Sequence, residues 1–255
     1  MPTTLDLPAP PALPRGIDLP TEDGENLKSA WHLKSMWLLI ASVEQHWLGR
    51  DDFFVGGNQY FYFDPKQARN TKFQGPDFYV VKGVNRFPIR PSWVAWEEGW
   101  RVPNVIVELL SPSTADHDRT YKKKVYLQDL DVREYFCFDP DGDVLEGWRK
   151  NGKRKPTAIK TQDGRLWSEE LELFLGPWEG VYLRDRQTWL RMFDANGNLS
   201  LIADEASEQR AETAAARAEV EAARAEAERK AKDAALAELA KLRAELAALK
   251  TTPTA

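Results

Sequence analysis

Two short stretches decide the fold predicted for this chain, GPDFYVV at residues 75–81 and NVIVELLS at residues 104–111. Both are rich in β-branched and aromatic residues and bounded by turn formers, a pattern typical of buried strands. Each carries one carboxylate in apolar surroundings, Asp77 where the first strand begins and Glu108 inside the second. An ionised carboxylate in an apolar strand is unfavourable unless something compensates its charge, and a metal ion is a usual compensation. The pair therefore predicts a metal site.

A basic run follows these strands in the sequence, Lys122-Lys123-Lys124, within a segment that the pattern predicts to be a helix over residues 115–129. On helical spacing Lys122 shares a face with Tyr126, whereas Lys123 points about 100° away. At most one lysine of the run should therefore face the carboxylates. We expect it to be Lys122, with Lys123 and Lys124 as alternatives.

Two carboxylates and a lysine are the groups that metal-assisted hydrolysis of a phosphodiester requires. Mg²⁺ or Mn²⁺ bound by Asp77 and Glu108 would neutralise phosphate charge and supply hydroxide near neutral pH, with a backbone carbonyl near Leu109 as a further ligand. Lys122 would orient the attacking water or stabilise charge at phosphorus. The alternative is purely structural, because buried acids also serve as caps or ion-pair partners and a lysine run is usually a solvated face.

Composition sets the limits of these hypotheses. The 255 residues suffice for one large domain and an appendage. The net charge of -5 is weak evidence against a nucleic-acid partner, although it leaves room for a local basic channel. Cys137 is the single cysteine, which excludes a disulfide framework. No apolar stretch approaches the ~20 residues that span a bilayer and no secretory signal is evident, so we expect a cytoplasmic protein without a membrane partner.

The chain divides into three parts by composition. Residues 1–20 are rich in proline, which predicts an extended arm. Residues 21–200 carry the alternating strand and helix patterns of a folded domain. Residues 204–250 consist almost wholly of Ala, Glu, Arg, Lys and Leu, without Gly or Pro, which predicts one long helix. Its last leucines recur every three or four positions, a coiled-coil pattern through which the tail would bind a partner helix or a second copy, although a solvated helix is the alternative.

The first helix of the domain is expected over residues 26–48. Apolar residues recur there every three or four positions and predict the packed face. They are Leu33, Trp37, Ile40, Val43 and Trp47. The helix also carries His32, Glu44 and His46, which at such positions are more often solvated or satisfied in a core than catalytic. Glu44 stays a candidate ligand, because an acid on the first helix sometimes joins a metal site of this type.

The remaining patterns favour an α/β domain. Two aromatic strands, at residues 53–55 and 60–63, flank a glycine turn, and the tryptophan-rich span 83–103 is expected to be a packed loop. A strand at residues 133–138 follows the helix, and a strand–helix–strand unit of this kind usually joins parallel neighbours. Shorter strands are expected at residues 144–148, 156–160, 181–183 and 189–193.

Several of these motifs together resemble the Uma-two family, restriction-endonuclease-like proteins of the PD-(D/E)XK nuclease superfamily. The resemblance spans about residues 21–198. It is carried by Gly75-Pro76-Asp77, by Ile106 to Thr114 around Glu108, by Asp118-Arg119 with Lys122 and Tyr126, and by Arg133 to Phe136 with Asp139-Pro140. The resemblance implies a mixed sheet flanked by helices and a Mg²⁺-dependent nuclease acting on DNA, with the family's aspartate at Asp77 and its glutamate at Glu108.

The sequence departs from the superfamily pattern at one position. Leu110 stands two residues after Glu108, where a lysine is expected, and the resemblance places the lysine on the following helix at Lys122. His32 resembles a recurrent position of the family, without a chemical role that we can give it. A different hypothesis therefore stays open, in which the nuclease-like body is a non-catalytic scaffold and the helical tail recruits a partner or forms a dimer.

Overall fold

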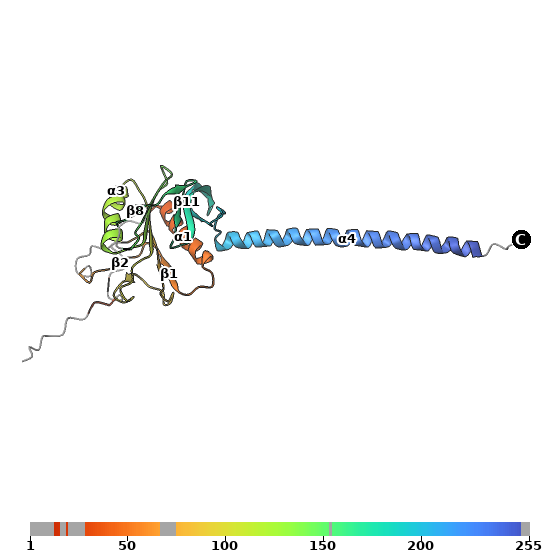
Figure 1. Ribbon diagram of the computed structural model, residues 1–255, viewed down its shortest axis with the longest axis horizontal. Coiled ribbons are helices and arrows are strands. Elements are labelled where there is room, and N and C mark those ends of the chain that lie inside the picture. Colours follow the sequence, from red (N-terminus) through yellow and green to blue (C-terminus); the bar gives the residue numbers. More distant parts are fainter. Residues whose placement is uncertain (1–12, 16–18, 20–28, 67–74, 153–154, 251–255) are drawn as a thin grey trace, which may run out of the picture. The chain divides into compact units, whose positions relative to one another are not determined.

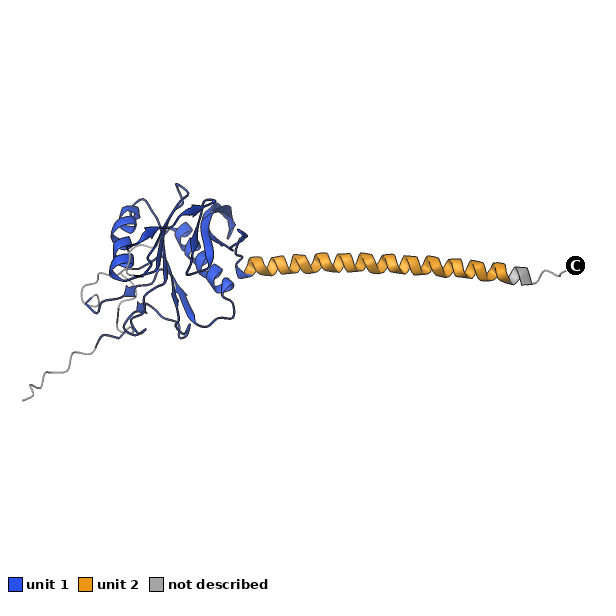
Figure 2. Cartoon of the chain, in the orientation of Figure 1, with its two compact units in different colours: residues 1–203 blue, residues 204–255 orange. Residues whose placement is uncertain are grey.

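The computed structural model describes residues 13–15, 19, 29–66, 75–152 and 155–250, with the side chains of 247–250 excepted. The chain divides into two compact units, residues 1–203 and residues 204–255 (Figure 2). Most of the proline-rich arm expected at residues 1–20 lies outside the described residues.

A six-stranded mixed sheet forms the centre of the first unit (Figure 1). The strands, in their order across the sheet, are β1 (Phe53–Gly56), β3 (Phe78–Lys82), β5 (Val105–Leu109), β6 (Glu134–Asp139), β7 (Val144–Arg149) and β8 (Thr157–Ala158). β5 and β6 are parallel, and the other neighbours are antiparallel. The predicted α/β class with a mixed sheet is confirmed, including the parallel pair on either side of the 115–129 helix.

Two smaller sheets complete the unit. One is an antiparallel sheet in the order β12–β11–β10–β9, and the other pairs β2 with β4 in parallel. The strands are β2 (Phe61–Tyr62), β4 (Trp93–Val94), β9 (Thr161–Gln162), β10 (Arg165–Ser168), β11 (Leu173–Tyr182) and β12 (Asp185–Phe193). The two aromatic strands expected on either side of the glycine turn are present as β1 and β2, but they pair with other strands, β1 with β3 and β2 with β4. Trp93 in β4 is fully buried, so part of the span 83–103 does pack as expected.

Helix α1 (Ala30–His46) packs against one face of the six-stranded sheet and against β12 (Figure 1). The face predicted for it was partly wrong, because Leu33 and Trp37 are 49% and 58% exposed. The buried positions include two serines and a histidine besides apolar residues. They are His32, Ser35, Met36, Leu38, Leu39, Ser42 and Val43.

The opposite face of the sheet is covered by the helical segment Ala115–Asp129, which we call the crossover helix (Figure 1, at α3). It consists of α3 (Ala115–His117) followed by two wider π-helical stretches, η2 (Asp118–Lys122) and η3 (Val125–Asp129). Its buried side chains pack on Tyr135 of β6, whose hydroxyl donates a 2.8 Å hydrogen bond to the Asp118 carbonyl. The crossover helix is thereby fixed over the strands that carry the candidate carboxylates.

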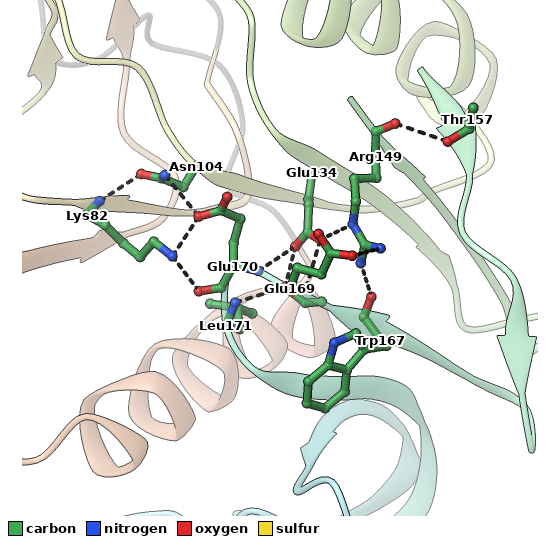
Figure 3. A network of polar contacts seen from close by, with 10 residues as sticks. Lys82, Asn104, Glu134, Arg149, Thr157, Trp167, Glu169, Glu170 and Leu171 are labelled. Atoms are coloured by element: carbon green, nitrogen blue, oxygen red, sulfur yellow. Dashed lines mark hydrogen bonds and ion pairs between the residues drawn. The ribbon is translucent and has the colours of Figure 1, made fainter. Parts of the chain in front are cut away.

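A buried polar network joins the six-stranded sheet to the β10–β11 connection (Figure 3). Glu134 of β6 is fully buried and accepts hydrogen bonds from the Arg149 guanidinium (2.7 Å), the Ser168 hydroxyl and the Glu169 amide (2.9 Å). Lys82 of β3 reaches the same connection, where its Nζ lies 2.6 Å from a Glu170 oxygen. Donors from several elements therefore satisfy both oxygens of the Glu134 carboxylate.

The second unit is one helix, α4 (Ala203–Lys250). This agrees with the long helix predicted for the charged tail. Its side chains are exposed throughout the stretch 207–246, including Leu236, Leu239, Leu242 and Leu246. Of the helices in the described residues, none combines the length and the apolar character that crossing a membrane requires.

Candidate active site

Strands β3 and β5 bring Asp77 and Glu108 together. Their antiparallel register pairs Phe78 with Val107, so the next pair toward this end is Asp77 with Glu108. The Asp77 amide donates to Oε2 of Glu108 (3.4 Å), and the Leu109 amide donates to Oδ2 of Asp77 (2.8 Å). The side chains are 3% and 0% exposed. Each carboxylate is thus oriented by the backbone of the other's strand.

Lys122 reaches Glu108 from the crossover helix. Its Nζ lies 3.1 Å from Oε2 of Glu108 and 2.9 Å from Oδ1 of Asp118, one helical turn earlier. Burial by itself would lower the pKa of Lys122, but the Glu108 carboxylate, with Tyr126 and Asp118, raises it above the ordinary value. Lys122 is therefore a positively charged donor at neutral pH, and its charge compensates those of Glu108 and Asp118.

His32 approaches Asp77 from the other side of the sheet. It lies in the first turn of α1, where its amide donates to the Ser29 hydroxyl at 3.2 Å. Its Nε2 is 3.0 Å from Oδ2 of Asp77, the same oxygen that accepts from the Leu109 amide. The imidazole is 10% exposed. Asp77 is consequently held between a strand amide and a buried histidine.

The other charged candidates lie elsewhere. Lys123 turns away, with its Nζ 4.1 Å from the centroid of the Trp148 ring, and Lys124 is exposed. Glu44 forms an ion pair with Arg86, at 2.6 Å between Oε2 and Nη2. Leu110, at the position where the superfamily pattern has its lysine, is 3% exposed and packs in the core beneath the crossover helix. Because this strand position holds a buried leucine, the cation beside Glu108 is Lys122 of the crossover helix.

Tyr126 completes the surroundings of the acids. Its hydroxyl is buried and has no hydrogen-bond partner within the described part of the chain. Burial raises the pKa of Tyr126 well above its ordinary value, and the nearby Glu108 carboxylate raises it further. A buried hydroxyl without a protein partner is uncommon and calls for an explanation, of which a missing water or ion is one.

The donor set fits a divalent cation of the Mg²⁺ kind. Among residues 29–66, 75–152 and 155–250, no group of three or more His, Cys, Asp or Glu side chains is arranged to hold a metal ion. Mg²⁺ does not require such a cage, because it commonly binds through one or two carboxylates and keeps several waters. Asp77 and Glu108 supply two carboxylates on adjacent strands, beside the unpartnered hydroxyl of Tyr126.

Comparison with known families bears on this arrangement of residues. Residues 28–179, more than half of the chain, match the model of the family Uma2, described as "Putative restriction endonuclease". The chain belongs to the Uma2 family. No curated protein matches the sequence. Among solved structures, this Uma2 chain resembles one described as that of "a putative nuclease belonging to DUF820" from Anabaena variabilis, with 13% identity, coverage of 59% of this chain and 80% of that chain, and a TM-score of 0.43.

Sequence reasoning gave no role to two residues that this Uma2 structure places at the site. The contact of Asp118 with Lys122 could have been inferred from the sequence. Asp118 precedes Lys122 by four positions, and an acid and a base at i,i+4 lie on the same helix face. His32 had no such signal, because its contact with Asp77 joins residues far apart in the chain. The serines of α1 give an indirect hint, since polar residues at helical spacing show that the buried face is not wholly apolar.

Proposed function

We propose that this protein is a Mg²⁺-dependent endonuclease that hydrolyses phosphodiester bonds of DNA. Asp77 and Glu108 would bind the metal, and Lys122 would assist the attacking water. The observation that supports the proposal most directly is the reciprocal hydrogen bonding of Asp77 and Glu108 across β3 and β5, with Lys122 3.1 Å from the glutamate. Membership of a family described as restriction endonucleases agrees with it.

Each residue of the candidate site would have a separate role in the proposed reaction. Asp77 and Glu108 present oxygen ligands that the opposite strand has already oriented, so little freedom is lost when they bind. Mg²⁺ or Mn²⁺, when bound, would supply Lewis acidity and neutralise charge on the phosphate. Because the pKa of Lys122 is raised, its ammonium would act as a donor that positions water and stabilises charge at phosphorus, rather than as a base. Asp118 would keep that ammonium in place.

Calorimetric titration followed by plasmid nicking tests the proposal. Mg²⁺ and Mn²⁺ are titrated into the wild type, Asp77→Asn and Glu108→Gln, and the same samples are assayed for nicking of supercoiled plasmid. The matched control is Glu146→Gln. Glu146 lies on β7 in the same row of residues across the sheet as Glu108, with Cys137 between them, and it pairs with Arg119 instead.

The proposal expects binding and nicking in the wild type and the control, and the loss of both in the two site variants. The amide replacements keep the shape of each side chain, and Lys122 retains Asp118 as a partner, so the variants should remain folded. Nicking that persists in Asp77→Asn or Glu108→Gln would refute the assigned roles. Absence of metal binding in the wild type would refute the metal dependence.

The tail supports a second proposal, that α4 associates with a partner helix or with another copy of the chain. Leu236, Leu239, Leu242 and Leu246 are each about half exposed and recur at spacings of three and four, as in a coiled-coil seam. Light scattering on the whole chain and on residues 1–203 tests self-association. A mass equal to one chain for both proteins over a wide concentration range would contradict self-association, and a partner helix would then be the remaining form of the proposal.

A further inference from the structure

A basic groove lies between the crossover helix and the β7–β8 side of the six-stranded sheet. It is a cavity of about 520 Å³ lined by the crossover helix, the end of β7 and the residues before β8. Three lysines from these three places line it, Lys123, Lys150 and Lys155, together with Trp148. We call these four residues the lysine groove.

The charge of the lysine groove is largely uncompensated. Lys150 has a carboxylate partner, with its Nζ 2.9 Å from Oδ1 of Asp131. In the part of the chain that the structure describes, neither Lys123 nor Lys155 contacts a carboxylate. Two unpaired ammonium groups in one groove are notable in a chain whose net charge is -5, since acidic residues are abundant elsewhere. Such a groove attracts a polyanion.

Trp148 holds one of these lysines in position. The Nζ of Lys123 lies 4.1 Å from the centroid of the indole ring, and the ring stacks on Tyr135 at 6.2 Å between centroids. An ammonium on an aromatic face is attracted by the ring quadrupole and still keeps donors for another ligand. Since Lys123 occupies this position at the ring, the arrangement suits a phosphate better than a stacked base.

The lysine groove lies close to the candidate active site. Lys122 and Lys123 are consecutive, and the first points to β5 whereas the second points to Trp148 on β7, with β6 between the two strands. Two strand spacings are about 10 Å, and the row of Trp148 lies two residues, about 7 Å, along the strands from the row of Glu108. The two places are therefore about 12 Å apart, which corresponds to three to four base-pair steps of duplex DNA at ~3.4 Å each. One backbone could therefore reach both places.

We propose that the lysine groove binds the phosphate backbone of the DNA whose cleavage is proposed above, a few nucleotides from the bond at Asp77 and Glu108. The inference depends on the proposed function for the identity of the substrate, but its test does not require cleavage. Lys123 and Lys155 make the phosphate contacts, and Trp148 positions Lys123. Contacts of this kind give affinity and register without sequence preference.

The test is the salt dependence of DNA binding by the full chain. Fluorescence anisotropy with a labelled duplex of about 20 base pairs, in EDTA, measures the dissociation constant between about 0.05 and 0.2 M salt. The variant is Lys123→Gln with Lys155→Gln. The matched control is Lys124→Gln with Lys160→Gln, which removes two exposed charges from the same two regions of the sequence outside the groove. Circular dichroism verifies the fold of both.

We expect the groove variant to bind DNA about tenfold more weakly per lysine at about 0.1 M salt, with a salt slope smaller by about two. The control should bind nearly as the wild type does. An unchanged salt slope in the groove variant, or equal losses of DNA affinity in the variant and the control, would refute DNA binding by the lysine groove. Neither result would contradict the nuclease proposal. DNA binding that depends on the groove in a protein without nicking activity would support the groove and refute the nuclease.

Discussion

Nε2 of His32, in the first turn of α1, lies 3.0 Å from Oδ2 of Asp77, the residue that precedes β3. Asp77 is thus contacted from the side of the sheet opposite to the crossover helix that brings Lys122 to Glu108. Removal of a group that orients a metal-binding carboxylate commonly lowers metal affinity or activity by about 10–100-fold. The contact gives His32 a testable role as a positioning residue.

Replacement of His32 should therefore act on the proposed metal site. We expect His32→Ala to weaken Mg²⁺ binding and to slow nicking by about 10–100-fold, and His32→Gln, which keeps a donor, to restore much of both. Calorimetry and plasmid nicking measure the two effects. His46→Ala, at the other end of α1, is the control and should resemble the wild type. Unaltered metal affinity in His32→Ala would show that the contact is only structural.

Lys122→Met should separate metal binding from catalysis. The substitution leaves Glu108 and Asp118 without their common cation, so we expect the metal-free protein to lose roughly 3–5 kcal/mol of stability. Because the pKa of Lys122 is raised in the folded protein, this contribution is present throughout neutral pH and is lost only at strongly alkaline pH.

A divalent cation should take the place of the missing ammonium in Lys122→Met. We expect tighter Mg²⁺ binding than in the wild type, a melting temperature that Mg²⁺ restores, and no nicking. Thermal melts with and without Mg²⁺ and the nicking assay measure these quantities. A variant that nicks at the wild-type rate would remove Lys122 from the proposed mechanism.

Gly57 should be required for the placement of Asp77. A Cβ added at Gly57 would lie 2.4 Å from the carbonyl oxygen of Asp77, and that atom belongs to the backbone and cannot rotate away. We expect Gly57→Ala to destabilise the protein by about 1–3 kcal/mol and to reduce nicking. Gly75→Ala is the control, because its Cβ would meet its nearest neighbour at an ordinary 3.5 Å. Urea unfolding compares the two, and equal stabilities would contradict the prediction.

Glu134 should be a main determinant of stability in the network of Figure 3. Glu134→Ala removes the buried acceptor of Arg149, of the Ser168 hydroxyl and of the Glu169 amide, and we expect a loss of roughly 3–5 kcal/mol. Glu169→Ala breaks a contact to the same Arg149 through a side chain that is 60% exposed. It should therefore lower the unfolding free energy by less than about 1 kcal/mol. Similar losses in the two variants would be inconsistent with this difference.

Cys137 should be unreactive in the folded protein. It is fully buried in β6, and burial raises the pKa of its thiol, so the reactive thiolate is scarce at pH 8. We expect modification by a thiol reagent to proceed only as fast as the protein unfolds, and to become immediate in denaturant. A time course of absorbance with and without urea measures this. Rapid modification of the native protein would show that β6 opens locally.

The sequence reveals much of this fold because the local signals are strong. Runs of β-branched and aromatic residues marked the strands that contain Val80 and Ile106, and the strand–helix–strand order implied the parallel pairing of β5 with β6. Spacing along the crossover helix separated the direction of Lys122 from that of Lys123. The metal-binding and catalytic roles of these residues stay predictions, which the experiments above address.

Contacts between distant segments could not be derived in the same way. Local patterns indicated the two aromatic strands beside the glycine turn but not their partners, because Phe61 pairs with Trp93 and no local pattern encodes that choice. On α1 the apolar spacing through Trp37 was misleading, because the buried face includes Ser35 and Ser42, of which Ser42 is satisfied by the Leu38 carbonyl at 2.8 Å. Burial of hydroxyls that bond within their own helix weakens the apolar signal on the packed face.

The cation of this site is attached to a helix instead of to the strand that bears Glu108, since Leu110 fills the strand position. The site therefore exists only while the crossover helix is docked through residues such as Tyr126 and through the bond from Tyr135. Undocking of one helix requires less free energy than global unfolding. The proposed nuclease activity should accordingly be lost on warming before the sheet melts, and a ligand that favours docking of the crossover helix would raise that activity without touching the carboxylates.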